Sequence, residues 1–136
     1  MRLSQQLANL MGTMQLPEDI ELITPVPLHK SRLLQRGFNQ SANIAYHLAK
    51  IKGLPYKHDI IKKTQNTPPQ SLMQREERLK NIKGKFEVRD NRSIDGKTIL
   101  LFDDVVTTSA TVNECAKMLK KAGARSVYVL SVARSF

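Results

Sequence analysis

The sequence contains little cysteine and few aromatic residues. Cys115 is its single cysteine, which excludes an internal disulfide and a zinc cluster built from cysteines. There is no tryptophan, and the four phenylalanines and three tyrosines are not interleaved with basic residues along a strand, so an OB-fold or RRM surface for single strands is not indicated. His29, His47 and His58 show no metal-ligand spacing with one another or with Cys115, so no protein metal site is indicated.

Long apolar runs and internal repeats are also absent. No apolar stretch approaches the length of a membrane-spanning helix, and the N-terminal segment MRLSQQLANLMG lacks the apolar region and cleavage site of a signal peptide. We therefore expect a cytoplasmic protein without a membrane partner. A length of 136 residues is typical of one domain, so we predict a single domain over residues 1–136.

Acidic residues are scarce in the middle of the chain. The formal net charge is +10, and residues 29–92 hold 15 Lys and Arg against 5 Asp and Glu, whereas the rest of the chain holds 7 of each. A segment this basic favours a polyanionic partner, either a phosphorylated small molecule, nucleic acid or both. The alternative is a solvated surface that favours solubility, and for any single lysine this is the stronger explanation.

Apolar periodicity predicts alternating helices and strands in the first two thirds of the chain. The predicted elements are, in order, a helix over 3–15 within an N-terminal helical segment 1–18, a strand over 20–24, a helix from about 44 to 51 that ends near Gly53, a strand over 56–61, a flexible loop over 62–74, a charged helix over 75–83 and a short strand over 86–88.

The last part of the chain predicts a βαβ unit. Residues 98–102 form an almost wholly apolar run, as expected of a strand buried on both faces of a parallel sheet. A polar loop over 103–111 follows, then a helix with an apolar stripe that ends at Gly123, then an apolar strand over 126–132. The predicted class is therefore α/β, with a mainly parallel central sheet flanked by helices. Ligands of such sheets bind at the carboxyl ends of the strands.

The loop at the end of the first of these strands has the residue types of a ribose 5-phosphate site. The adjacent carboxylates of Asp103 and Asp104 suit the vicinal hydroxyls of a ribose. The following helix N-terminus offers unpaired N–H groups and a positive dipole end to a phosphate. The alternative is a plain strand-to-helix turn with an Asp cap, which does not account for two acids and four hydroxyls in nine positions. The candidate ribose 5-phosphate residues are Asp103, Asp104, Val105, Thr107, Thr108, Ser109, Ala110 and Thr111, and Asp103 and Asp104 are also the candidate catalytic residues.

Residues 99–111 (ILLFDDVVTTSAT) resemble the signature with which type I phosphoribosyltransferases bind 5-phosphoribosyl 1-pyrophosphate (PRPP). Ser109 stands where that family usually has glycine, and serine resists positive φ more than glycine does. Two further stretches resemble the ComF (competence protein F) family. They are PVPLH at 25–29 with RGFNQ at 36–40, and a middle segment that includes Thr64, Thr67-Pro68, Gln70-Ser71-Leu72, Arg75, Arg78, Asn81, Gly84 and Phe86.

The resemblance covers residues 23–134 and implies a type I phosphoribosyltransferase-like fold. It implies that the loop after the first strand binds pyrophosphate, with Lys30, Arg32 and Arg36 as the candidate cations. It also implies that a flexible basic loop, 62–78 here, closes over the substrate. Mg²⁺ is expected to bind through PRPP itself. ComF relatives commonly carry an N-terminal zinc-binding cysteine segment, which this sequence lacks; either it was truncated or the chain is a shorter relative.

The resemblance implies a role in natural transformation, which is the uptake of DNA, and leaves three functions open. The first is magnesium-dependent transfer of a phosphoribosyl group from PRPP to an acceptor, with release of pyrophosphate. The alternative is a non-catalytic competence factor that binds single-stranded DNA through the basic 29–92 segment, with PRPP as ligand or regulator and proteins of the competence machinery as further partners. The third is a phosphosugar-binding domain that has the fold without the chemistry.

Overall fold

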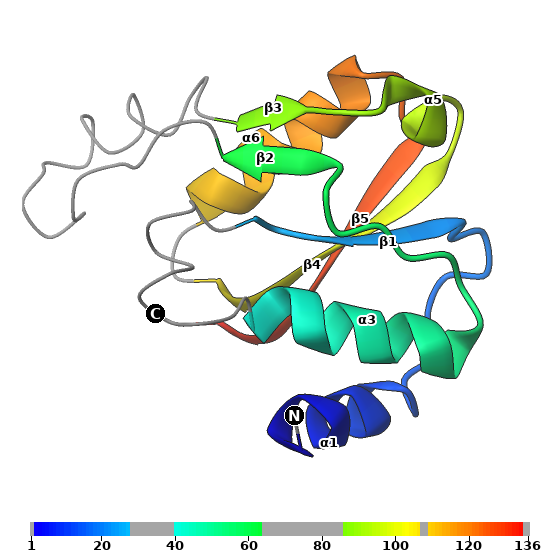
Figure 1. The fold of residues 1–136 in the computed structure, drawn as a ribbon, viewed down its shortest axis with the longest axis vertical. Helices are drawn as coiled ribbons and strands as arrows, with labels where there is room; N and C mark the ends of the chain where they lie inside the picture. Colours follow the sequence, from blue (N-terminus) through cyan, green and yellow to red (C-terminus); the bar gives the residue numbers. More distant parts are fainter. Residues whose placement is uncertain (1, 28–39, 64–85, 107–108, 135–136) are drawn as a thin grey trace, which may run out of the picture.

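A three-stranded parallel sheet organises the protein (Figure 1). The computed structural model describes residues 2–27, 40–63, 86–106 and 109–134. The strand order is β1 (Leu22–Pro25), β4 (Thr98–Val106) and β5 (Ser126–Arg134), and β4 pairs in parallel with both neighbours. A single parallel bridge between Ile23 and Tyr56 continues the sheet beyond β1.

Helices cover both faces of the sheet (Figure 1). On one face lies α3 (Gln40–Lys52), with α1 (Arg2–Met11) packed on its outer side. On the other face lies α6 (Ser109–Lys121), which connects β4 to β5 and so completes the predicted βαβ unit. An antiparallel pair lies on the α6 side, and in sequence the short helix α5 follows it. These elements are β2 (Ile61–Lys63), β3 (Phe86–Val88) and α5 (Asn91–Ile94).

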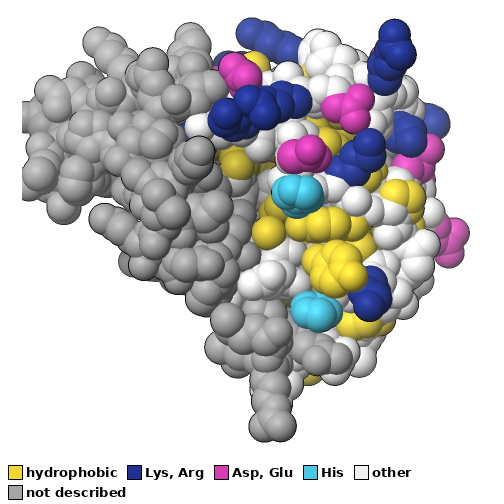
Figure 2. Space-filling model, viewed as in Figure 1, with side chains coloured by type: hydrophobic (Ala, Val, Ile, Leu, Met, Phe, Trp, Pro, Cys, Tyr) yellow, Lys and Arg dark blue, Asp and Glu magenta, His cyan; other side chains and the backbone are white. Residues whose placement is uncertain are grey.

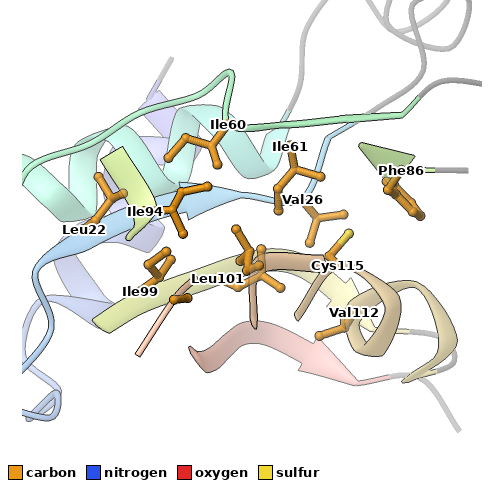
Figure 3. Packing of buried hydrophobic residues seen from close by; sticks show 12 residues of the cluster. Leu22, Val26, Ile60, Ile61, Phe86, Ile94, Ile99, Leu101, Val112 and Cys115 are labelled. Atoms are coloured by element: carbon orange, nitrogen blue, oxygen red, sulfur yellow. The ribbon is translucent and has the colours of Figure 1, made fainter. Parts of the chain in front are cut away.

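The alternation of side chains along β4 divides the core into two clusters, one on each face. Ile99 and Leu101 pack on the α6 side with Cys115, and Leu100 and Phe102 pack on the α3 side. Figure 3 shows the α6-side cluster between the sheet and α6. All four β4 residues are at most 2% exposed, as predicted for a strand covered on both faces.

Most of the predicted elements are confirmed near their expected positions. The N-terminal helix, the helix that ends at Lys52, the strand over 86–88 and the two C-terminal strands are all present. Gly123 ends α6 with a φ of 110°, as expected of a helix C-terminal glycine. Among the described residues, no helix combines the length and the apolar character needed to cross a membrane. The predicted helix over 75–83 lies outside the described residues.

Two predicted boundaries after α3 are wrong. The strand predicted over 56–61 is reduced to the bridge at Tyr56, and β2 starts at Ile61. The cause is burial, because Ile60 and Ile61 turn into the α6-side cluster and β2 pairs there with β3. The loop predicted over 62–74 therefore starts late, since Lys62 and Lys63 belong to β2. Residues 64–74 of that loop lie outside the described residues.

The loop predicted over 103–111 is also corrected. Strand β4 continues through Val106, so Asp103 and Asp104 are strand residues, and α6 begins at Ser109. The parallel ladder with β5 explains the extension, because Asp103 pairs with Ser131 and Val106 with Arg134. Backbone hydrogen bonding thus carries the strand beyond the end of its apolar run.

Candidate functional site

The candidate site lies at the carboxyl edge of the sheet. In Figure 1 the carboxyl ends of β1, β4 and β5 and the N-terminal ends of α3 and α6 all lie at the same edge. Two helix N-termini, each the positive end of a helix dipole, therefore face the edge at which Asp103 lies. This is the edge at which ligands of parallel α/β sheets bind.

A hydrogen bond ties Asp103 to the first turn of α3. The Ser41 hydroxyl donates to Oδ1 of Asp103 over 3.3 Å, although the two residues are 62 positions apart in the sequence. Ser41 is 4% exposed, and Asp103 is half-buried. A hydrogen bond from a buried hydroxyl limits the orientations of the carboxylate. Sequence reasoning missed Ser41, although it directly follows the RGFNQ stretch at 36–40.

The first turn of α6 follows the acids closely. Two residues, 107–108, separate the end of β4 from Ser109, the first residue of the helix. Ala110 and Thr111 lie in this turn and are half-buried. The unpaired N–H groups of such a turn can hold phosphate oxygens. The arrangement places a carboxylate and a helix N-terminus within one strand-to-helix connection.

Several predicted site residues are described in part or not at all. For Asp104, Val105 and Ser109 the structure describes the backbone alone. Thr107 and Thr108 lie outside the described residues, as do Lys30, Arg32 and Arg36 of the predicted pyrophosphate loop. His29 and Phe38 lie in the same undescribed range, 28–39.

The buried thiol of Cys115 lies within electrostatic range of the candidate site. Burial raises its pKa, the carboxylates of Asp103 and Glu114 raise it further, and Lys63 acts in the opposite direction. Cys115 is fully buried in the α6-side cluster. It is therefore a buried core residue whose thiol stays protonated.

The described side chains offer no cage for a metal ion. Within the described ranges, no group of three His, Cys, Asp or Glu residues comes together as ligands. A protein magnesium site usually combines one or two carboxylates with phosphate oxygens and water.

The sequence and the fold are similar to those of several known proteins. The family model described as "Phosphoribosyl transferase domain" matches residues 33–134. Competence protein F of Haemophilus influenzae is 32% identical over 116 residues, which are 85% of this chain and 51% of that protein. DNA utilization protein YhgH of Escherichia coli is 32% identical over 122 residues, which are 90% of this chain and 52% of that protein.

The chain thus spans about half the length of the curated relatives it matches. Among solved structures, the glutamine PRPP amidotransferase of Bacillus subtilis, complexed with ADP and GMP, is similar with a TM-score of 0.65. That similarity has 22% identity and covers 95% of this chain and 26% of the amidotransferase.

Proposed function

The chain belongs to the phosphoribosyl transferase domain family, and from this premise we propose that it binds PRPP at the carboxyl edge of its sheet. The predicted phosphoribosyltransferase-like fold is confirmed by the solved structures, and the resemblance to the competence protein F family by the curated relatives. The PRPP site itself is supported by the hydrogen bond of Ser41 to Asp103 beside the N-terminus of α6.

In this proposal the two acids bind the sugar and the turn binds its phosphate. Asp103 and Asp104 accept hydrogen bonds from the ribose hydroxyls, and the backbone N–H groups and hydroxyls of 107–111 bind the 5-phosphate. Lys30, Arg32 and Arg36 follow β1 in the chain and bind the pyrophosphate oxygens. Mg²⁺ binds mainly through the phosphate oxygens of PRPP and water.

The proposed reaction is transfer of the phosphoribosyl group. The bond between C1 of the ribose and the pyrophosphate oxygen breaks, and its electron pair leaves with pyrophosphate. A lone pair of the acceptor nucleophile forms the new bond to C1, and the proton of the acceptor passes to water. The protein contributes by positioning the ribose through its hydroxyls and by stabilising the negative charge of the leaving group.

Calorimetric titration of PRPP with Mg²⁺ tests the site. We expect binding to the wild type and its loss in Asp103→Ala/Asp104→Ala. Glu18→Ala/Asp19→Ala is the matched control, because it also removes two adjacent acids, both exposed and outside the carboxyl edge. Absence of binding to the wild type, or equal binding by both variants, would contradict the proposal. Pyrophosphate release in the presence of candidate acceptors then distinguishes an enzyme from a domain that only binds PRPP.

A second candidate function is binding of single-stranded DNA by a competence factor. The charge of 15 Lys and Arg against 5 Asp and Glu in residues 29–92 favours it, because such a segment displaces counterions from a phosphate backbone. The YhgH relative is named a DNA utilization protein, which points in the same direction. The test is a fluorescence titration of a labelled oligothymidylate at several salt concentrations. Binding that weakens steeply with salt supports this candidate.

A further inference from the structure

Four aromatic rings from two separate segments of the sequence lie together on the α3 side of the molecule. They belong to Tyr46, His47, Tyr56 and His58, and we call them the ring platform. The centroid of Tyr46 lies 5.4 Å from that of His47 and 5.6 Å from that of Tyr56, and Tyr56 lies 6.5 Å from His58. Figure 2 shows histidine side chains on either side of a hydrophobic strip on this face.

Hydrogen bonds hold the segment around Tyr56 against β1 and α3. Pro55 accepts a hydrogen bond from the Ile23 N–H, and the Lys57 N–H donates to the Ile23 carbonyl, so this segment runs beside β1. The Tyr56 hydroxyl donates to the carbonyl of Ala42 over 3.1 Å, in the first turn of α3. Partial burial and Asp59 raise the pKa of Tyr56 to about 12, which keeps this hydroxyl a donor. The platform therefore begins near the turn that carries Ser41.

Two of the four rings are exposed at the surface. Tyr46 is 45% exposed, and His58 is also exposed. Tyr56 and His58 are two residues apart and nearly parallel, with an interplanar angle of 20°. Near-parallel rings of this kind offer flat surfaces in one orientation, on which planar bases can stack.

A cation suited to a phosphate accompanies the rings. Lys50 is exposed, its Nζ lies 5.4 Å from the centroid of Tyr46, and it forms no ion pair with a described carboxylate. Lys57 is less available, because its Nζ is 3.1 Å from Oδ2 of Asp90. A surface hollow of about 220 Å³ adjoins the platform and is lined by Asn9, His47, Lys50 and Ile51. Ring faces next to a free lysine and a hollow suit a nucleotide chain.

We propose that the ring platform binds single-stranded DNA by stacking its unpaired bases, with Lys50 contacting the phosphates. The proposal deepens the second candidate function and rests on it, since it assigns a surface to the DNA. The rings discriminate single strands from duplex because a paired base does not expose its face. Tyr46 and Lys50 are one helical turn apart on α3, so one strand can contact both.

Binding of a fluorescein-labelled oligothymidylate to the full chain tests the platform. We expect Tyr46→Ala/His58→Ala to lose about fivefold or more in affinity, because stacking on one ring contributes at least that much per base. Tyr46→Phe keeps the ring and should bind as the wild type does. Tyr128→Ala is the matched control, since Tyr128 is the third tyrosine, is 37% exposed and lies on β5. Circular dichroism of each variant checks that the fold is intact.

Salt and duplex measurements separate stacking from charge. The aromatic double variant should lower affinity without changing the slope of log affinity against log salt, whereas Lys50→Ala should reduce the slope. Equal affinity of wild type and double variant, with DNA still bound, would overturn the platform and leave the second candidate function intact. Equal affinity for duplex and single strand would also overturn it. No DNA binding by the wild type would overturn both.

Discussion

At the scale of single residues, the hydroxyl of Ser41 restricts the orientation of one carboxylate in the candidate site. It donates to Asp103 from a buried position. Without it the carboxylate gains rotational freedom, which binding of a ligand to that carboxylate would have to remove. In the proposed PRPP site Ser41 is therefore a positioning residue that acts through Asp103.

We expect Ser41→Ala to raise the Kd for PRPP roughly tenfold, which is about 1.4 kcal/mol and typical of a hydrogen bond to a charged group. Calorimetry measures this directly. Ser93→Ala is the control, because the Ser93 hydroxyl also donates to a carboxylate, Oδ2 of Asp90, but this hydrogen bond is exposed and lies in another part of the fold, at α5. Loss of affinity in the control as well would point to a general effect on folding. Unchanged affinity in Ser41→Ala would contradict the positioning role.

Thr24 places a polar hydroxyl in the buried interior of the protein. It is fully buried in β1, and its hydroxyl has no hydrogen-bond partner among the residues that the structure describes. An unsatisfied buried hydroxyl costs free energy, and valine has the same shape without that group. We expect Thr24→Val to raise the free energy of unfolding by about 1 kcal/mol. Urea denaturation measures it, and a destabilised variant would show that the hydroxyl has a role which outweighs its desolvation.

At the scale of elements, the end of α6 depends on Gly123. Its φ is 110°, and a Cβ there would lie 2.6 Å from Oδ1 of Asp95. Gly53 ends α3 with a φ of 68°, and a Cβ there would have nothing within 4 Å. Both glycines therefore supply the positive φ that a helix C-terminus requires. At Gly123 there is also no room for a Cβ beside Asp95.

We expect Gly53→Ala to lower the free energy of unfolding by about 1 kcal/mol, the cost of the left-handed backbone alone. Gly123→Ala should cost more, because a φ of 110° lies farther from the left-handed region that alanine can adopt and because its Cβ also meets the Asp95 side chain. Adding Asp95→Ala should recover part of that difference, which urea denaturation of the single and double variants can resolve. Equal costs at the two glycines would contradict the steric contribution.

At the scale of the whole molecule, the net charge of +10 acts on stability as well as on binding. Repulsion among like charges destabilises a compact state, and salt screens it. The two described ion pairs, Lys57 with Asp90 and Arg89 with Glu87, are exposed and contribute little in the opposite direction.

We therefore expect sodium chloride to raise the free energy of unfolding while it weakens the binding of DNA. Urea denaturation and oligothymidylate titration over one salt series measure the two effects side by side. A free energy of unfolding that falls with salt would mean that attractive charge pairs outweigh the repulsion. The urea measurement is independent of whether DNA binds.

The βαβ unit could be predicted from the sequence because its signals are local. Residues 98–132 contain, in order, an apolar run, two adjacent acids, a helix with an apolar stripe, a terminal glycine and a second apolar run. These local signals are enough to predict β4, α6 and β5. The boundaries were less predictable. Strand β4 extends beyond its apolar run because β5 continues to pair with it. Strand β2 begins later in the sequence than predicted because Ile60 and Ile61 are buried in the α6-side cluster.

The sequence by itself determined the α/β class, the family resemblance and the position of Asp103 and Asp104, because each depends on neighbouring residues. The tertiary structure alone decided that Ser41 reaches Asp103 and that Tyr46 meets Tyr56 and His58. These contacts follow from the packing of α3 against the sheet and of residues 55–57 beside β1. Periodicity identifies the buried face of a helix, but which surface side chains come together depends on how the elements pack.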